Sequence, residues 1–307
     1  MIASATLFGA LATAAASPSP EDRRDIALSR AIVRRVGDRI WPNWSKTPFA
    51  IDLLTARGPV AIDFPKPLAP PSFPRQLEAA FPLANGVPTI VIGERQFTAA
   101  KTPTRWSVTL IHEHFHQWQY SWPAYQAAIT GLALAPKSEK NAMWMLNYPF
   151  PYEEPRIDRL YNRMATSLAA AVTAIGSGHF KTRLVAYLGA RGAFRRALKP
   201  NDYRYFAFQC WQEGVARYTE ITVARSAAEE HKSDSAFLTD TEARALLQDS
   251  TATYASVVKR LRSNSLASEQ RTDFYALGAG EALLLDEANP QWRRGYLDKR
   301  MDLGLYF

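Results

Sequence analysis

The chain has 307 residues, of which 47% are hydrophobic, 12% aromatic and 21% charged. This length and composition allow a substantial buried core and exclude a globally disordered chain. The formal net charge is +8, but the basic residues occur in several separate segments and form no known nucleic-acid-binding motif. We therefore expect no nucleic-acid partner and interpret these charges as solvated helix faces.

Residues 1–16 have the pattern of a secretory signal peptide. They form an apolar run of small residues that ends in an Ala-x-Ala-like site at residues 14–16, although no Lys or Arg precedes the run. The run is shorter than the roughly 20 residues that cross a bilayer, and no later stretch is long and uncharged enough, so we expect no integral membrane segment after cleavage. The sequence predicts an exported protein, periplasmic or extracellular, that begins near Ser17. Its single cysteine, Cys210, excludes an intrachain disulfide.

The mature chain, residues 17–307, is predicted to be one domain with two lobes. A first helix is expected over residues 21–41, because Ile26, Val33 and Ile40 recur at helical spacing. Prolines then recur from residue 42 to residue 88, which excludes long helices but allows short strands at residues 49–55, 59–64 and 88–93. We expect these strands to form a small bent sheet in a lobe of about residues 41–122.

The pattern becomes helical from residue 104 onward. Helices are predicted at residues 104–122, 156–175, 179–198, 202–230, 241–261 and 273–288. All but the first of these belong to a predicted helical lobe of about residues 123–307. The expected fold class is therefore α+β and mainly helical, with a small N-terminal sheet and a helical C-terminal lobe.

Residues 111–119, IHEHFHQWQ, contain three of the five histidines of the chain. His112, Glu113 and His116 form an H-E-x-x-H motif. Because residues four apart lie on one face of a helix, both imidazoles can bind one ion while Glu113 reaches the attacking water. Zinc-assisted hydrolysis with a carboxylate as general base is typical of this pattern. His114 points about 200° away from His112 around the helix and is expected to take no part.

A third metal ligand has to come from elsewhere in the chain. The metzincin extension requires Gly and His where this chain has Gln119 and Trp122, so that class is excluded. Deformylases take a cysteine upstream of the motif, whereas Cys210 lies downstream. A downstream glutamate remains. For Glu213 taken alone, the alternative is a surface residue paired with Arg217, and Cys210 is an alternative soft ligand.

The segment WQEGVARYTE, residues 211–220, resembles the second zinc-binding segment of gluzincin metallopeptidases. This class includes the large one-zinc aminopeptidases and exported peptidase-MA-like proteins, and the shared pattern is Trp-x-Glu-Gly-x-Ala after an H-E-x-x-H. The resemblance implies a zincin-like fold with Zn²⁺ bound by His112, His116 and Glu213. An insertion separates the two segments here.

Two further residues are assigned from this resemblance. Arg217 replaces the aspartate that orients a zinc-binding histidine in thermolysin-type members, so Glu220, which points within about 20° of the direction of Glu213, is the nearest substitute. Residues 274–286, FYALGAGEALLLD, resemble the Tyr-x-x-Gly segment of one-zinc aminopeptidases, which implies that Tyr275 donates to the oxyanion. The alternatives are a core role for Tyr275, with glycines for close helix packing, and Tyr218 as the donor.

The leading hypothesis is an exported gluzincin-like zinc metallopeptidase with a peptide or protein substrate. The G-x-M-E-N strand of the aminopeptidases is missing from the sequence, so the resemblance favours a metallohydrolase more than an exopeptidase. The substrate is expected to lie between an edge strand of the sheet and the helical lobe, beside the aromatic loop at residues 147–155. Two alternatives stay open: an inactive exported binding protein with a vestigial zinc site, and a zinc hydrolase that acts on ester or cell-wall amide bonds.

Overall fold

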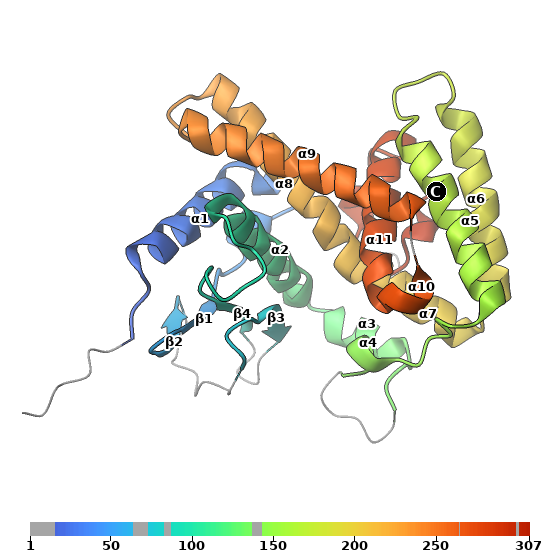
Figure 1. Cartoon of the computed structure of the whole chain (residues 1–307), viewed down its shortest axis with the longest axis horizontal. Helices are drawn as coiled ribbons and strands as arrows, with labels where there is room; N and C mark the ends of the chain where they lie inside the picture. Colours follow the sequence, from blue (N-terminus) through green and yellow to red (C-terminus); the bar gives the residue numbers. More distant parts are fainter. Residues whose placement is uncertain (1–15, 64–72, 83–86, 137–142, 264, 299–300) are drawn as a thin grey trace, which may run out of the picture.

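A computed structural model describes residues 16–63, 73–82, 87–136, 143–263, 265–298 and 301–307. The predicted signal peptide lies outside the described residues, apart from its last position. The described chain is mainly helical with one small mixed sheet (Figure 1), which confirms the predicted α+β class. None of its helices is long and apolar enough to cross a membrane.

The sheet has four short strands in the order β2-β1-β4-β3. The strands are β1 (Ile51–Thr55), β2 (Gly58–Ile62), β3 (Glu78–Pro82) and β4 (Pro88–Gly93). The central pair, β1 and β4, is parallel, and the two outer pairs are antiparallel. Three strands fall where the sequence predicts them. Strand β3 was not predicted, because its sequence EAAFP has few β-branched or aromatic residues.

Two helices connect the sheet to the rest of the molecule. Helix α1 (Pro20–Ile40) begins with a capping box formed by Ser19 and Asp22. Helix α2 (Pro103–Ser121) begins where the Thr102 side chain accepts a hydrogen bond from the Arg105 amide, with proline at the first helical position. Helix α2 packs against β3 and β4 on one side and against α1 and α8 on the other. It is thus the element shared by the sheet and the helices.

The remaining chain folds into a helical assembly that covers α2 on the side away from the sheet (Figure 1). Its elements are α3 (Tyr125–Gly131), α4 (Trp144–Asn147), α5 (Pro155–Val172), α6 (Phe180–Ala197), α7 (Pro200–Gln209), the π-helical segment η2 (Cys210–Gly214), α8 (Val215–Ser233), α9 (Asp240–Arg262), α10 (Leu266–Glu269) and α11 (Asp273–Ala288). Short 3₁₀ turns complete it: η1 (Trp44–Lys46), η3 (Gln270–Thr272), η4 (Trp292–Gly295) and η5 (Leu303–Leu305). The six long helices predicted after residue 103 are all present. The helix predicted at residues 202–230 is the run α7-η2-α8.

An aromatic cluster fixes the apolar face of α2. Phe115 and Trp118 of α2 lie 5.1 and 5.4 Å from Trp41 at the end of α1, measured between ring centroids. Tyr296 stacks on Trp211 of η2 at 4.7 Å and on Trp118 at 6.0 Å. Because all these rings are buried, this cluster holds α2 and η2 in a fixed relation.

Helix α11 crosses the π-helical segment in backbone contact. A Cβ added to Gly214 would lie 2.4 Å from the Cα of Gly278, and one added to Gly278 would lie 2.2 Å from the carbonyl oxygen of Cys210. Only glycine fits at both positions. The crossing places Glu213, which precedes Gly214, near Tyr275, which lies one turn before Gly278 on α11.

Candidate metal centre

The structure brings the three predicted ligands together on two crossing helices. His112 and His116 lie one turn apart on α2, and their Nε2 atoms are 3.2 Å from each other. A carboxylate oxygen of Glu213, on η2, lies 3.3 Å from Nε2 of His116 and 3.8 Å from Nε2 of His112. Within the described chain these residues form a group that could hold a metal ion.

These separations are close to those between the ligands of a tetrahedral ion. Donors about 2.0–2.2 Å from one tetrahedral ion lie about 3.3–3.6 Å from one another, since the edge of a tetrahedron is about 1.6 times its centre-to-corner distance. The observed separations are 3.2, 3.3 and 3.8 Å. Both histidines are buried, whereas the Glu213 side chain is 20% exposed. A tetrahedral ion held by these three donors would have one further coordination position.

Glu213 sits in the one turn of its helix that departs from α geometry. The five residues of η2 form a π-helical turn between α7 and α8, a feature that is rare and often found at functional sites. Burial alone would raise the pKa of Glu213, but the two histidines outweigh it and hold that pKa well below its ordinary value. Glu213 is therefore ionised and can serve as an anionic ligand.

Glu220 orients His112 from the opposite side of the ring. Its Oε1 lies 2.6 Å from Nδ1 of His112, which leaves Nε2 directed at the cluster. This is the contact that a residue orienting His112 would make. Its Oε2 accepts hydrogen bonds from Arg105 and, at 2.8 Å, from Arg217. Arg217 is thus committed to Glu220, and the alternative in which it pairs with Glu213 is wrong.

The charge of Glu220 is fixed by its neighbours. Burial alone would raise its pKa, but Arg105, Arg217 and His112 hold the pKa of this carboxyl far below its ordinary value. Burial likewise favours a low pKa for His112, yet the nearby Glu213 carboxylate and the hydrogen-bonded Glu220 carboxylate raise it to about 9. Without an ion, this imidazole is therefore held as a cation between two carboxylates. A bound divalent cation would replace that proton.

His116 is oriented by amides instead of a carboxylate. Its Nδ1 lies 2.6 Å from Oε1 of Gln119 and 3.1 Å from Nε2 of Gln212. Gln119 donates in turn to the Tyr296 hydroxyl at 2.8 Å, and Gln212 accepts from Tyr125 at 3.1 Å. The two histidines therefore have different supports, a charged one for His112 and a neutral one for His116.

Glu113 lies beside the cluster without joining it. Its Oε1 is 4.0 Å from Nε2 of His112, and its side chain is buried. Burial raises the pKa of Glu113, while His112 and His116 oppose that shift. A carboxylate with a raised pKa next to the open position is suited to accept a proton from an attacking water.

Tyr275 reaches the same cluster from α11. Burial and the nearby carboxylate of Glu213 raise its pKa well above the ordinary value, so the hydroxyl keeps its proton. Arg271 donates to the Tyr275 oxygen at 3.1 Å. Gln270, just before it, has a φ of +50°, a strained backbone for a non-glycine residue and a common feature of functional sites. The contact of Arg271 with Tyr275 was not predicted from the sequence. The i, i+4 spacing of these two residues is the only indication of it there.

Three other residues considered from the sequence lie apart from the cluster. His114 stacks on Phe49 at 4.0 Å, bonds to Gln117 at 2.8 Å, and has its pKa lowered to about 4 by burial. Tyr218 donates to Asp286 at 2.7 Å. Cys210 is buried within the helical core and is not part of the group. His114 therefore faces away from the His112–His116–Glu213 group, as its position on the helix predicts.

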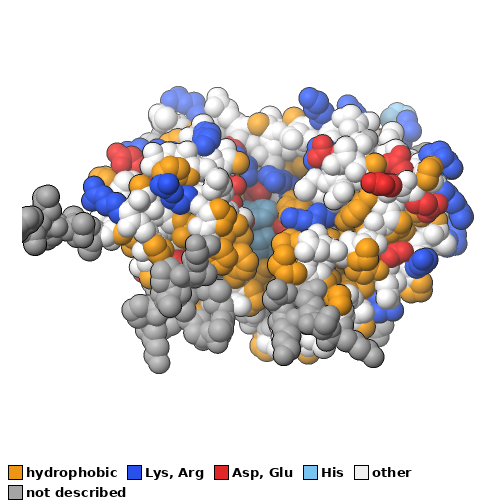
Figure 2. All heavy atoms as spheres, turned by 60° about the horizontal axis from the view of Figure 1, so that its bottom comes forward, with side chains coloured by type: hydrophobic (Ala, Val, Ile, Leu, Met, Phe, Trp, Pro, Cys, Tyr) orange, Lys and Arg blue, Asp and Glu red, His pale blue; other side chains and the backbone are white. Residues whose placement is uncertain are grey.

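The cluster opens into a hollow between the sheet and the helical assembly. Figure 2 shows histidine side chains at the floor of a hollow in the face displayed, with basic, acidic and hydrophobic side chains around it. On the sheet side, β3 is an edge strand that packs along α2, and Tyr120 of α2 donates to the carbonyl of Ala80 at 3.4 Å. Glu78 of β3 lies close enough to contribute to the raised pKa of Glu113.

The aromatic loop after α4 packs next to the helices that carry Glu213 and Tyr275. Phe150 and Tyr152 contact Phe274 of α11 at 5.3 and 6.1 Å between ring centroids. Tyr205 of α7 stacks on Tyr148 of the same loop at 4.6 Å, and Glu213 is near enough to help raise the pKa of Tyr205. The loop therefore lies at the helical side of the site.

No protein-family model, curated protein or solved structure matches this chain. The candidate centre is therefore supported by its own geometry: two imidazoles and a carboxylate at tetrahedral separations, each histidine oriented through Nδ1, and a buried carboxylate and a tyrosine beside the open position.

Proposed function

We propose that this protein is an exported zinc metallopeptidase of the gluzincin type. The observation that carries the proposal is the match between the donor separations in His112, His116 and Glu213 and the edges of a tetrahedral ion site. Two imidazoles, one carboxylate and one open position are the ligand set typical of catalytic zinc. Export is proposed from the signal-like pattern of residues 1–16.

Zinc in this position would supply a water of lowered pKa and would polarise the scissile carbonyl. Glu113 would accept the proton of the attacking water and pass it to the leaving amine, because its burial keeps its pKa raised. Tyr275 would donate its hydroxyl proton as a hydrogen bond to the developing oxyanion, with Arg271 fixing its position. Glu220 and Gln119 would hold the two imidazoles in place.

The proposed substrate is an extended peptide. Strand β3 has an unpaired edge in the described sheet and lies along the helix that carries Glu113. An extended chain can pair with such an edge through its own backbone. This would bring one peptide bond over the open position while side chains alternate between the two walls.

The metal assignment is tested by elemental analysis of purified protein. We expect about one zinc per chain, and loss of zinc from His112→Ala, His116→Ala and Glu213→Ala variants. His179→Ala is the control, because this histidine is exposed and far in sequence from the motif. A protein without zinc after reconstitution, or equal loss from the control, would contradict the assignment.

The peptidase assignment is tested with an unfolded protein substrate, followed by mass spectrometry of the fragments. Glu113→Gln is expected to keep zinc and to lose at least about 100-fold in turnover, because the general base is gone while the ligands remain. Zinc binding with no turnover of varied peptides would favour a binding protein. Turnover of esters or cell-wall amides alone would favour the other hydrolase class.

A further inference from the structure

The net charge of the molecule is concentrated on one helical hairpin. Residues 155–199, which comprise α5, α6 and the turn between them, contain nine of the 37 Lys and Arg residues and one of the 29 Asp and Glu residues. This segment therefore has a net charge of +8, equal to that of the whole chain. The rest of the protein is balanced. Such asymmetry creates a directed field that a uniformly basic protein lacks.

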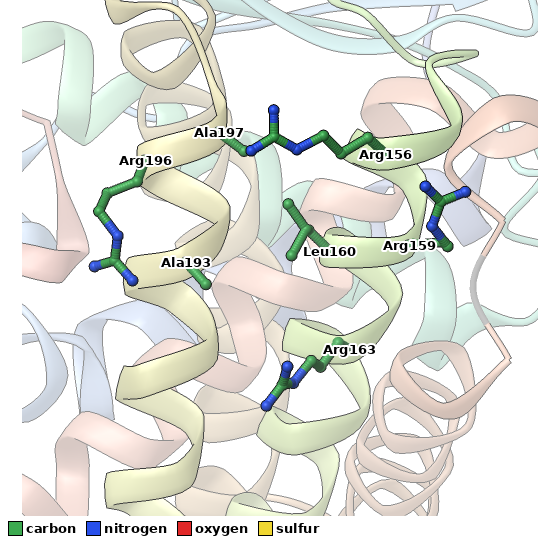
Figure 3. A pocket seen from close by; sticks show the side chains of 7 residues that line it. All are labelled: Arg156, Arg159, Leu160, Arg163, Ala193, Arg196 and Ala197. Atoms are coloured by element: carbon green, nitrogen blue, oxygen red, sulfur yellow. The ribbon is translucent and has the colours of Figure 1, made fainter.

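Four of these arginines surround a groove between α5 and α6 (Figure 3). The groove has a volume of about 500 Å³ and is lined by Arg156, Arg159 and Arg163 of α5 and by Arg196 of α6. In Figure 3, Arg156 and Arg163 extend toward α6, whereas Arg159 and Arg196 lie at the outer sides of the two helices. All four are exposed, and in the described part of the chain none forms an ion pair. Leu160, Ala193 and Ala197 form the floor.

The groove continues along the hairpin. A second hollow of about 470 Å³ is lined by Thr166 and Ala170 of α5, by Thr173 just after this helix, by Arg183 of α6 and by Arg262 of α9. Residues 159, 163, 166, 170 and 173 fall within about 40° of one direction on the helix, so both hollows follow one face. The 18 residues of α5 span about 27 Å, the length of about eight extended residues.

We propose that this groove binds an extended acidic segment of a polypeptide. Unpaired guanidinium groups on both walls fit carboxylates, which they can bind in bidentate fashion. The floor of small side chains lets a peptide backbone approach both helices. The site is distinct from the metal centre, since α5 and α6 contribute none of the residues of that centre.

The lining favours a peptide over other anionic partners. Single-stranded nucleic acid is usually held by aromatic side chains that stack on the bases, and neither hollow is lined by Phe, Tyr or Trp. An anionic bilayer binds a helix that exposes large apolar and aromatic side chains beside its basic residues. Here the surface between the arginines is concave and lined mostly by alanine and threonine.

The proposal is tested by fluorescence anisotropy with a labelled peptide of about eight residues that has Glu at alternate positions. The zinc-loaded Glu113→Gln protein is used so that the peptide is not cleaved. We expect saturable binding that is lost when Gln replaces Glu in the peptide and that weakens as salt rises from about 0.05 to 0.5 M. The triple variant R159Q/R163Q/R196Q should bind at least about tenfold more weakly.

The matched control is R34Q/R57Q/R244Q, which removes the same charge from three exposed arginines outside the hairpin. It should bind the acidic peptide as the parent does. An equal loss in both triple variants would overturn the proposal, because net charge and not the groove would then account for binding. Tighter groove-dependent binding of an oligothymidylate or of phosphatidylglycerol vesicles would also overturn it. Removing zinc with a chelator should leave peptide binding unchanged, which separates this proposal from the proposed peptidase activity.

Discussion

The support that Glu220 gives to His112 makes a quantitative prediction for Glu220→Gln. Gln can still accept the hydrogen bond from Nδ1 of His112, at the 2.6 Å contact seen here, but it has no charge to raise the basicity of the imidazole. Loss of such an outer support typically lowers metal affinity about 10–100-fold, or about 1.4–2.7 kcal/mol. We expect a loss in this range.

The free energy of unfolding should also fall, because Arg105 and Arg217 lose the negative charge with which they pair. Arg105 keeps one carboxylate, Asp249 at 3.1 Å, so the cost should stay below the roughly 3–5 kcal/mol of a fully broken buried pair. A control must reproduce this cost away from the metal. Glu281→Gln does so: Glu281 is fully buried, accepts from Arg191 at 2.6 Å, and leaves Arg191 with Asp302 at 3.1 Å.

The assay has two readouts on each variant: zinc affinity from competition with a fluorescent chelator, and stability of the metal-free protein from urea unfolding. Both variants should lower the unfolding midpoint, and only Glu220→Gln should weaken zinc binding. Unchanged zinc affinity in Glu220→Gln would refute the assigned role of this residue. Weakening by the same factor in Glu281→Gln would show that affinity follows global stability instead.

Three further predictions concern other parts of the molecule. Gly278→Ala should destabilise the fold by about 3 kcal/mol or more in urea unfolding, because its Cβ would lie 2.2 Å from the Cys210 carbonyl oxygen. Gly58→Ala is the control and should cost less, since its Cβ would meet no atom within 4 Å although Gly58 has a positive φ. Tyr275→Phe should lower peptide turnover about 100-fold with zinc content unchanged, as measured by steady-state kinetics and elemental analysis. Burial raises the pKa of Asp52 above 3.8, so the folded state holds this proton more tightly than the unfolded state. Asp52→Asn should therefore be the more stable protein at pH 7, and the difference should vanish below pH 3.8 in urea titrations.

Much of the metal centre could be predicted because its residues lie on regular helices. The spacing of His112 and His116 fixes them on one face of α2 whatever surrounds that helix. The seven-residue spacing from Glu213 to Glu220 keeps both carboxylates on one side of their helix, and Glu220 lies where this arithmetic places it, against His112. Periodicity also predicts the long helices, since each buries an apolar stripe.

Other features depend on contacts between distant segments, which periodicity does not encode. Strand β3 has little β propensity of its own and forms through pairing with β4 and packing on α2. Arg271 follows a strained backbone at Gln270 and reaches the site only because α11 crosses η2. The arginine-lined groove also depends on tertiary packing, because the arginines of α5 and α6 line one groove only when the two helices pack together.

The π-helical turn depends both on helical periodicity and on contacts between distant segments. A π turn holds one residue more than an α turn and is rare. It therefore persists where tertiary contacts favour it. Here those contacts are the Gly214–Gly278 crossing, where no side chain fits, and the stacking of Trp211 on Tyr296. Both lie next to Glu213. The same packing that stabilises the irregular turn therefore fixes the carboxylate of the candidate metal centre, which accounts for the Trp and Gly that flank this glutamate.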